Sequence, residues 1–128
     1  MPDYLQLIGL ALKAEGPPHC GRALLYAEVE DGVISASAFF ERDEGDVAFR
    51  YASDELETLV YQFWEKGSDR VQPKSWRAIE YVVSGSKLSV DLTYQEQFNE
   101  AEGQHERRPR VVARHFSGSK VDFSQPDG

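Results

Sequence analysis

Two stretches of alternating residues, each folded back by a glycine-containing dipeptide, constrain this chain more than any other feature. In the first, LYAEVEDGVISASAFF at residues 25–40, Asp31-Gly32 is suited to a two-residue hairpin loop. In this hairpin the residue numbers of two paired residues add up to 63. This pairing places only apolar residues on one strand face and a mixture of polar and apolar residues on the other, which we call the wetter face. The apolar face holds Ala23, Leu25, Ala27, Val29, Ile34, Ala36, Ala38 and Phe40, and the other holds Leu24, Tyr26, Glu28, Glu30, Val33, Ser35, Ser37 and Phe39. A shift of one residue would mix the sets, so the pattern predicts the register.

The second stretch, WRAIEYVVSGSKLSVDLTY at residues 76–94, sorts in the same way around Gly85-Ser86. Paired positions sum to 171. Ile79, Tyr81 and Val83 then face Leu92, Val90 and Leu88, while Glu80, Val82 and Ser84 face Asp91, Ser89 and Lys87. Two hairpins with one apolar face each are typical of an antiparallel sheet that is covered on one side only.

Capping and periodicity predict the remaining elements. Residues 2–15 form an amphipathic helix that ends at Gly16, and residues 47–52 form a third strand. Ser53 caps a second helix that ends near Gly67, and Pro109 begins a short helix over 109–116, followed by an extended tail at 121–123. We therefore expect residues 1–128 to form a single α+β domain. Its order is α-β-β-β-α-β-β-α, with a five-stranded antiparallel sheet and helices packed on one face.

The charge of the chain is negative and unevenly spread. The net charge is −8 at pH 7, and residues 28–57 contain ten acidic residues against Arg42 and Arg50. Such a field repels nucleic acid and anionic membranes and attracts basic partners, although it also serves solubility alone. No apolar run approaches the roughly 20 residues of a membrane span, and the N-terminus lacks the pattern of a signal peptide. A single cysteine, Cys20, fits a reducing compartment, so we expect a cytoplasmic protein.

No motif indicates catalysis, a metal or a cofactor. Neither SGSK segment (84–87 and 117–120) has the spacing of a phosphate-binding loop, and one cysteine with three scattered histidines gives no metal-ligand pattern. Glu80 and Asp91 lie opposite each other in the predicted register, but an open sheet face offers no cleft to desolvate one of them. The arginines at 107, 108, 110 and 114 are interpreted as a salt-bridged helix face or a partner contact. A nucleic-acid site is disfavoured because residues 1–102 hold 19 acidic and 9 basic residues.

The remaining candidate is a binding surface. Carboxylates, hydroxyls and an aromatic ring on rigid strands suit a positively charged protein partner, such as a nuclease that holds phosphates with Lys and Arg. The predicted contact residues share the uncovered sheet face or the turn at its margin. They are Tyr26, Glu28, Glu30, Asp31, Glu41, Asp43, Glu44, Asp46, Glu80 and Asp91.

The chain resembles the YezG-like immunity proteins of bacterial polymorphic toxin systems. The resemblance lies in LYAEVEDG at 25–32, Phe39-Phe40, Trp76, GSKLSVDLTY at 85–94, and the basic helix that runs to Phe116-Ser117-Gly118 before VDF. It spans nearly the whole chain as a pattern of strand and aromatic positions. It implies a non-catalytic protein that binds and neutralises a cognate toxin domain, and it assigns no contact residue.

Two other classes of function stay open. A small-ligand-binding or regulatory domain would use a groove between the sheet and its helices, with Trp64, Trp76 and Tyr81 as candidate lining residues. An internal cavity of a few hundred Å3 with inward polar groups would favour that class. An enzyme would require a cluster of titratable residues that the sequence does not assemble.

Overall fold

The computed structural model describes residues 3–17, 21–30, 33–42, 45–67, 76–94, 97–98, 101–116 and 121–122. The elements are α1 (Tyr4–Glu15), β1 (Arg22–Glu30), β2 (Val33–Glu41), β3 (Val47–Tyr51), α2 (Asp54–Gln62), a π-helical turn (Phe63–Gly67), β4 (Trp76–Ser84), β5 (Lys87–Tyr94), α3 (Gln104–His115) and β6 (Val121–Asp122). The α+β fold and the predicted element order are confirmed. The two residues of β6 belong to the expected extended tail and join the sheet as a sixth strand.

The sheet has the strand order β5-β4-β1-β2-β3-β6. The first five strands are antiparallel to their neighbours, and β6 runs parallel to β3. Both predicted hairpin registers are confirmed, since Leu25 pairs with Ala38 and Glu80 pairs with Asp91. Gly85 has φ of +62°, which a glycine adopts without strain in the tight turn between β4 and β5. Residues 31–32, predicted as the first turn, lie outside the described residues.

One face of the sheet packs against α1 and α2. Its core contains the predicted apolar set, including Leu25, Ala27 and Phe40, together with Ile8, Leu12, Leu56 and Val60 from the helices. Asp3 caps α1 by accepting a hydrogen bond from the Gln6 amide, and Ser53 caps α2 through the Leu56 amide. Trp64 donates a hydrogen bond from Nε1 to the Trp76 carbonyl at 2.8 Å, which satisfies its only polar atom within this core.

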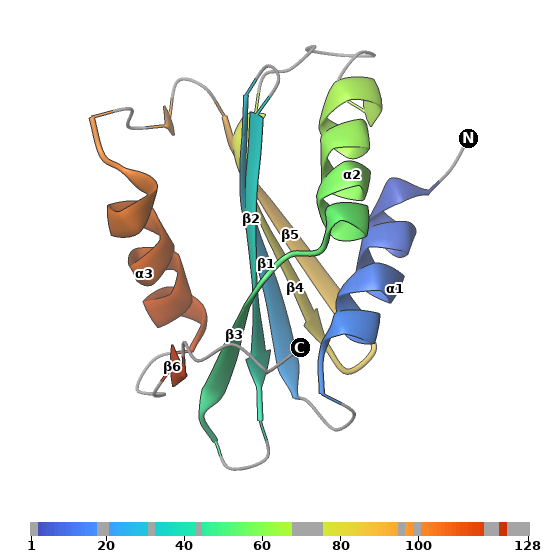
Figure 1. The fold of residues 1–128 in the computed structure, drawn as a ribbon, viewed down its shortest axis with the longest axis vertical. Helices are drawn as coiled ribbons and strands as arrows, with labels where there is room; N and C mark the ends of the chain where they lie inside the picture. Colours follow the sequence, from blue (N-terminus) through green and yellow to red (C-terminus); the bar gives the residue numbers. More distant parts are fainter. Residues whose placement is uncertain are drawn as a thin grey trace.

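The other face of the sheet is covered as well, and the expectation of helices on one face only is wrong. In Figure 1, α3 lies on the opposite side of the sheet from α1 and α2. A second core joins the sheet residues Leu24, Phe39 and Val82 to Val111 and Val112 of α3 and to its C-cap residue, Phe116. Leu24, Phe39 and Val82 belong to the strand face predicted to be exposed to solvent. The burial of these apolar side chains is the physical reason why α3 covers this face.

The helix α3 begins five residues before its predicted start. Gly103 is its N-cap, and Pro109 lies inside it rather than at its first position. A proline in the second turn removes one backbone hydrogen bond, but its ring is exposed and the packed face of the helix is unaffected. Side-chain bonds from the first turn to the sheet, such as Ser35 Oγ to Gln104 at 2.8 Å, hold this earlier start in place.

Candidate functional site

The polar half of the α3-covered face is a network of paired charges. The guanidinium of Arg107 donates two hydrogen bonds to Glu28, at 2.8 Å from Nε and 2.7 Å from Nη2. The Tyr26 hydroxyl donates to the same carboxylate at 2.6 Å. The side chains of Arg107 and Glu28 are only 14% and 13% exposed, so water screens this bidentate pair weakly. Glu28 is therefore neutralised inside the protein and is unavailable to a partner.

The electrostatics of this network follow from burial and from Glu28. Burial raises the pKa of Tyr26, and the hydrogen bond to Glu28 and the charge of that carboxylate raise it further, because an ionised phenol here would face a second anion. The hydrogen bond to Glu28 raises the pKa of Arg107. The hydroxyl thus stays protonated and donates, while the guanidinium stays charged.

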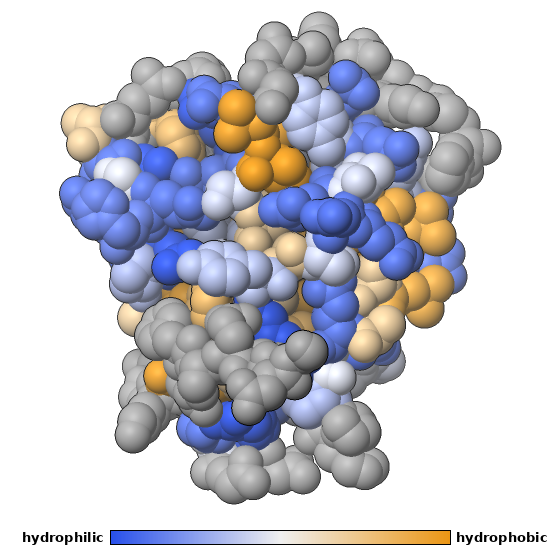
Figure 2. Space-filling model, in the orientation of Figure 1, coloured by the Kyte–Doolittle hydropathy of each residue, from blue (hydrophilic) through white to orange (hydrophobic). Residues whose placement is uncertain are grey.

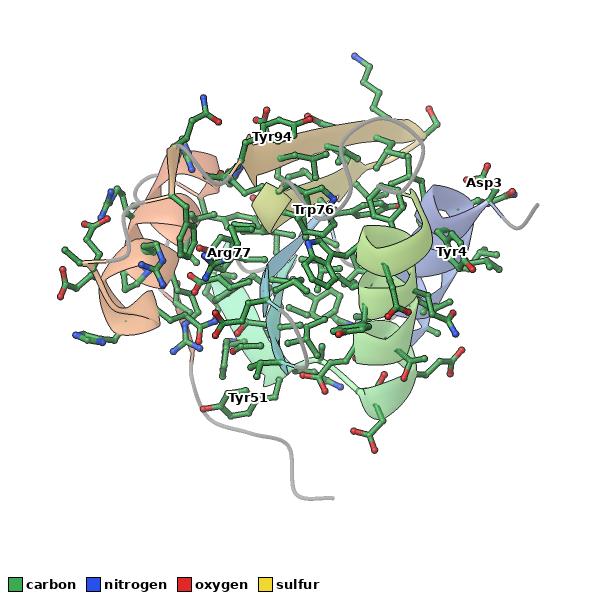
Figure 3. The ribbon with its side chains drawn as sticks, turned by 90° about the horizontal axis from the view of Figure 1, so that it is seen from above. Asp3, Tyr4, Tyr51, Trp76, Arg77 and Tyr94 are labelled. Atoms are coloured by element: carbon green, nitrogen blue, oxygen red, sulfur yellow. The ribbon has the colours of Figure 1, made fainter. Side chains whose placement is uncertain are left out.

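A second carboxylate on this face is satisfied by the end of α3. Glu80 is 7% exposed, and its two oxygens meet Arg114 Nη2 and His115 Nε2, each at 2.8 Å. Phe98 lies nearby with the guanidinium groups of Arg77 and Arg107 at 4.4 and 4.2 Å from its ring centre. Figure 3 shows Arg77 on the α3 side of the sheet, whereas Trp76 lies on the side of α2. A pocket of about 360 Å3 remains between this face and α3, and Tyr26, Glu80, Phe98, Arg107, Arg110 and Arg114 contribute to its lining.

The ten predicted contact residues do not form one open surface. Tyr26, Glu28 and Glu80 lie beneath α3, which corrects the expectation that they are exposed on an uncovered face. Glu41 accepts a hydrogen bond from the Arg22 amide at 3.2 Å, and Asp46 forms an ion pair with Arg42. Glu30 is exposed and pairs with Arg77 at 3.4 Å, and Asp91 is exposed on the edge strand β5. Asp31, Asp43 and Glu44 lie outside the described residues.

The arginines of α3 supply the neutralising charges that the sequence interpretation did not connect to the sheet. A salt-bridged helix face was one of the two alternatives for this cluster, and Arg107 and Arg114 confirm it through Glu28 and Glu80. The signal that could have predicted this pairing is the combination of Leu24 and Phe39 on the wetter strand face with a helix that is both basic and apolar. Trp64, Trp76 and Tyr81 lie in the core on the other side and do not line this pocket.

An open acidic groove lies on the other side of the sheet, beside α2, and the sequence interpretation missed it. Its volume is about 480 Å3, and it is lined by Ile34, Asp54, Glu57, Thr58, Tyr61 and Gln62. Residues 53–65 contain four acidic residues and no Lys or Arg. Glu15 adds a further carboxylate at the start of α2, where its Oε1 accepts a hydrogen bond from the Ser53 amide at 3.1 Å.

One carboxylate in this groove is held in an unfavourable environment. Burial raises the pKa of Glu57, the neighbouring charge of Asp54 raises it further, and a backbone hydrogen bond from Ala36 opposes both. A positively charged group placed in the groove would relieve this penalty. Among the described residues, no Lys, Arg or His forms an ion pair with Asp54 or Glu57. The groove places these carboxylates beside the ring of Tyr61 and the side chain of Ile34, a set that fits a Lys or Arg side chain with its aliphatic stem.

Within the described residues, no group of three or more His, Cys, Asp and Glu side chains is arranged to hold a metal ion. In that same part of the chain, no helix has the length and apolar character to cross a membrane. No known protein family matches the sequence, and no curated protein is similar enough to indicate a relationship.

Proposed function

We propose that this chain is a non-catalytic immunity protein that binds and neutralises a basic toxin domain, and that the acidic groove beside α2 is its docking site. The observation that carries the proposal is the groove itself, where Asp54 and Glu57 stand together with no basic residue on the same helix. A nuclease is the class of toxin that best fits, because it must hold phosphates with Lys and Arg. The resemblance to YezG-like immunity proteins supports the same class of function.

Binding would proceed by charge attraction followed by local desolvation. The negative field steers a basic partner toward the groove, and salt screens this attraction over about 10 Å. A Lys or Arg side chain that enters the groove pairs with Asp54 and Glu57 while its stem covers Tyr61 and Ile34. Occlusion of the partner's phosphate-binding side chains would then block its active site.

The test is co-expression and co-purification with the toxin domain encoded by the neighbouring gene. A double variant, Asp54→Lys with Glu57→Lys, should lose protection and weaken binding at least about tenfold, because the partner's cations then face like charges. Glu106→Lys on α3 is the matched control for each single variant, Asp54→Lys or Glu57→Lys, since it reverses one exposed charge on the other face. Full binding by the double variant, or no complex between the natural pair, would refute the proposal.

The pocket beneath α3 favours a second candidate function, the binding of a small polar ligand. Its volume and its polar lining, which includes Glu80 and Arg107, support this candidate. A thermal-shift screen of small carboxylates, phosphates and amino acids would test this candidate. A ligand that stabilises the natural chain and fails to stabilise Thr93→Trp, a variant that fills the pocket, would support it.

A further inference from the structure

The strand β5 forms one edge of the sheet, and its outward backbone groups are candidates for pairing with another chain. It is the outermost strand of the sheet, and no strand among the described residues pairs with its outer side. Figure 3 shows β5 at the margin of the sheet, with Tyr94 at its end. Lys87, Ser89 and Asp91 are exposed, and Leu88 is 48% exposed. Long edges of this kind readily pair with another chain unless a proline, a bulge, a covering segment or charged side chains protect them. The two charges on this edge, Lys87 and Asp91, are opposite in sign, so they can pair with each other between two chains. The bulge in this hairpin lies at Trp76/Ala78, at the far end from Lys87.

The turn before β5 determines which backbone groups face outward. Ser84 and Lys87 flank the two-residue turn, so in such a hairpin they exchange hydrogen bonds with each other. Alternation then directs Ser89 and Asp91 toward β4, and it directs the amides and carbonyls of Leu88, Val90 and Leu92 outward. Tyr94 is an even number of residues from Leu88, so its amide also faces outward, where it donates a hydrogen bond to Gln97 Oε1 at 3.3 Å.

We propose that two copies of this chain associate through their β5 edges in antiparallel fashion, with the two-fold axis at Ser89. In this register Lys87 lies directly opposite Asp91 of the second copy, and the same pair recurs by symmetry. Leu88 lies opposite Val90 of the second copy, so an exposed leucine gains an apolar neighbour. The outward amides and carbonyls of these residues form the hydrogen bonds of the seam, which joins the two sheets into one.

Charge selects this register over its neighbours. With the axis at Asp91, the two Asp91 carboxylates would lie directly opposite each other, and like charges across a strand pair repel. With the axis at Val90, Asp91 would lie opposite Ser89 and Lys87 opposite Thr93, which leaves both charges without a direct partner. Only the axis at Ser89 sets Lys87 against Asp91 twice. The inference is independent of the proposed function, because the acidic groove includes Ile34 of β2, three strands away from β5.

A cysteine cross-link tests the register. Cys20, the only cysteine in the sequence, is first replaced by serine. In that background Ser89→Cys should form an intermolecular disulfide under mild oxidation, because a directly opposed pair without shared backbone hydrogen bonds has its Cα atoms about 4.5 Å apart. Asp91→Cys is the matched control. Its two copies would be separated by four residues along the strand, or roughly 13 Å, which is beyond the reach of a disulfide. An equimolar mixture of Lys87→Cys and Asp91→Cys should cross-link.

Charge exchange tests the same contact in solution. Sedimentation equilibrium of the full chain should show a monomer–dimer equilibrium, and Lys87→Asp and Asp91→Lys should each weaken it about tenfold. Mixing these two variants should restore association, because each then supplies the charge that the other needs. Circular dichroism confirms that the variants are folded. A chain that stays monomeric at all concentrations, or a Ser89→Cys variant that does not cross-link, would overturn the proposal.

Discussion

The ion pair between Arg107 and Glu28 should be the main polar contribution to holding α3 on the sheet. Replacing Arg107 by Met leaves the Glu28 carboxylate nearly buried with one remaining donor, the Tyr26 hydroxyl. Removing one partner of a buried pair costs about 3–5 kcal/mol, and the lower value applies here because Tyr26 still donates. We expect a loss of about 3 kcal/mol in the free energy of unfolding, or roughly 10 °C in Tm for a domain of this size.

The reciprocal variant and the double variant separate this pairing from simple loss of packing. Glu28→Met should also cost about 3 kcal/mol, since it leaves a buried guanidinium without its carboxylate. The double variant should cost less than either single variant, because it leaves no unpaired charge buried. The coupling energy is then at least about 3 kcal/mol. Arg110→Met is the control on the same helix. Arg110 pairs with Glu102, but its side chain is 60% exposed, so it should cost less than about 1 kcal/mol.

Urea unfolding followed by circular dichroism measures these free energies, and all variants should retain similar m-values. Two results would refute the reasoning. One is a loss below about 1 kcal/mol for Arg107→Met, equal to that expected of the exposed control. The other is strict additivity in the double variant, which would mean that the two side chains stabilise the fold independently.

Three further predictions concern single hydroxyl, carboxyl and glycine positions. The raised pKa of Tyr26 means that the folded chain holds the hydroxyl proton more tightly than the unfolded chain does. The free energy of unfolding should therefore fall as the pH rises above about 10, the pKa of Tyr26 in the unfolded chain. Urea titrations of Tyr26→Phe should show a smaller fall. Glu57 also has a raised pKa in the folded chain, so its ionisation destabilises the fold at any pH above the pKa of Glu57 in the unfolded chain. Glu57→Gln should therefore be more stable than the natural chain at pH 7, and urea titrations should show this difference vanish in acid. A Cβ on Gly9 would lie 2.6 Å from the Tyr81 hydroxyl but 3.6 Å from the ring carbon that bears it. Gly9→Ala should therefore destabilise the natural chain, yet stabilise Tyr81→Phe by up to about 1 kcal/mol through helix propensity, which thermal melts of the four variants would reveal.

The sequence could predict both hairpins because their information is local. Alternation and turn chemistry act over a few residues, and burial of one face makes a register slip costly, so the pairing of Leu25 with Ala38 follows from the pattern alone. The helix bounds near Ser53 and Gly16 follow from capping in the same way. These features require no knowledge of where distant segments lie.

The second helical layer could not be predicted by the same reasoning. Arg107 meets Glu28 across 79 positions of sequence, and no local signal fixes such a contact. The wetter strand face also contained Leu24, Phe39 and Val82, whose burial required a cover. Considered together with the apolar residues of α3, they indicate a second core. Considered strand by strand, they resemble scattered exceptions on an open face.

The position of α3 changes where a basic partner can bind. Figure 2 shows hydrophobic surface along the margin where α1 lies, and the exposed apolar residues of this helix are Leu7 and Leu10. Arginines of α3 neutralise Glu28 and Glu80 on the sheet face, whereas no ion pair among the described residues neutralises Asp54 or Glu57. Stability and partner binding should therefore separate by mutation. Glu28→Met should lower the free energy of unfolding and leave the affinity for a basic partner unchanged while the chain is folded. Asp54→Lys should weaken the affinity for a basic partner and leave the free energy of unfolding nearly unchanged. A loss of affinity in Glu28→Met, measured well below its Tm, would show that the sheet face, and not the groove, contacts the partner.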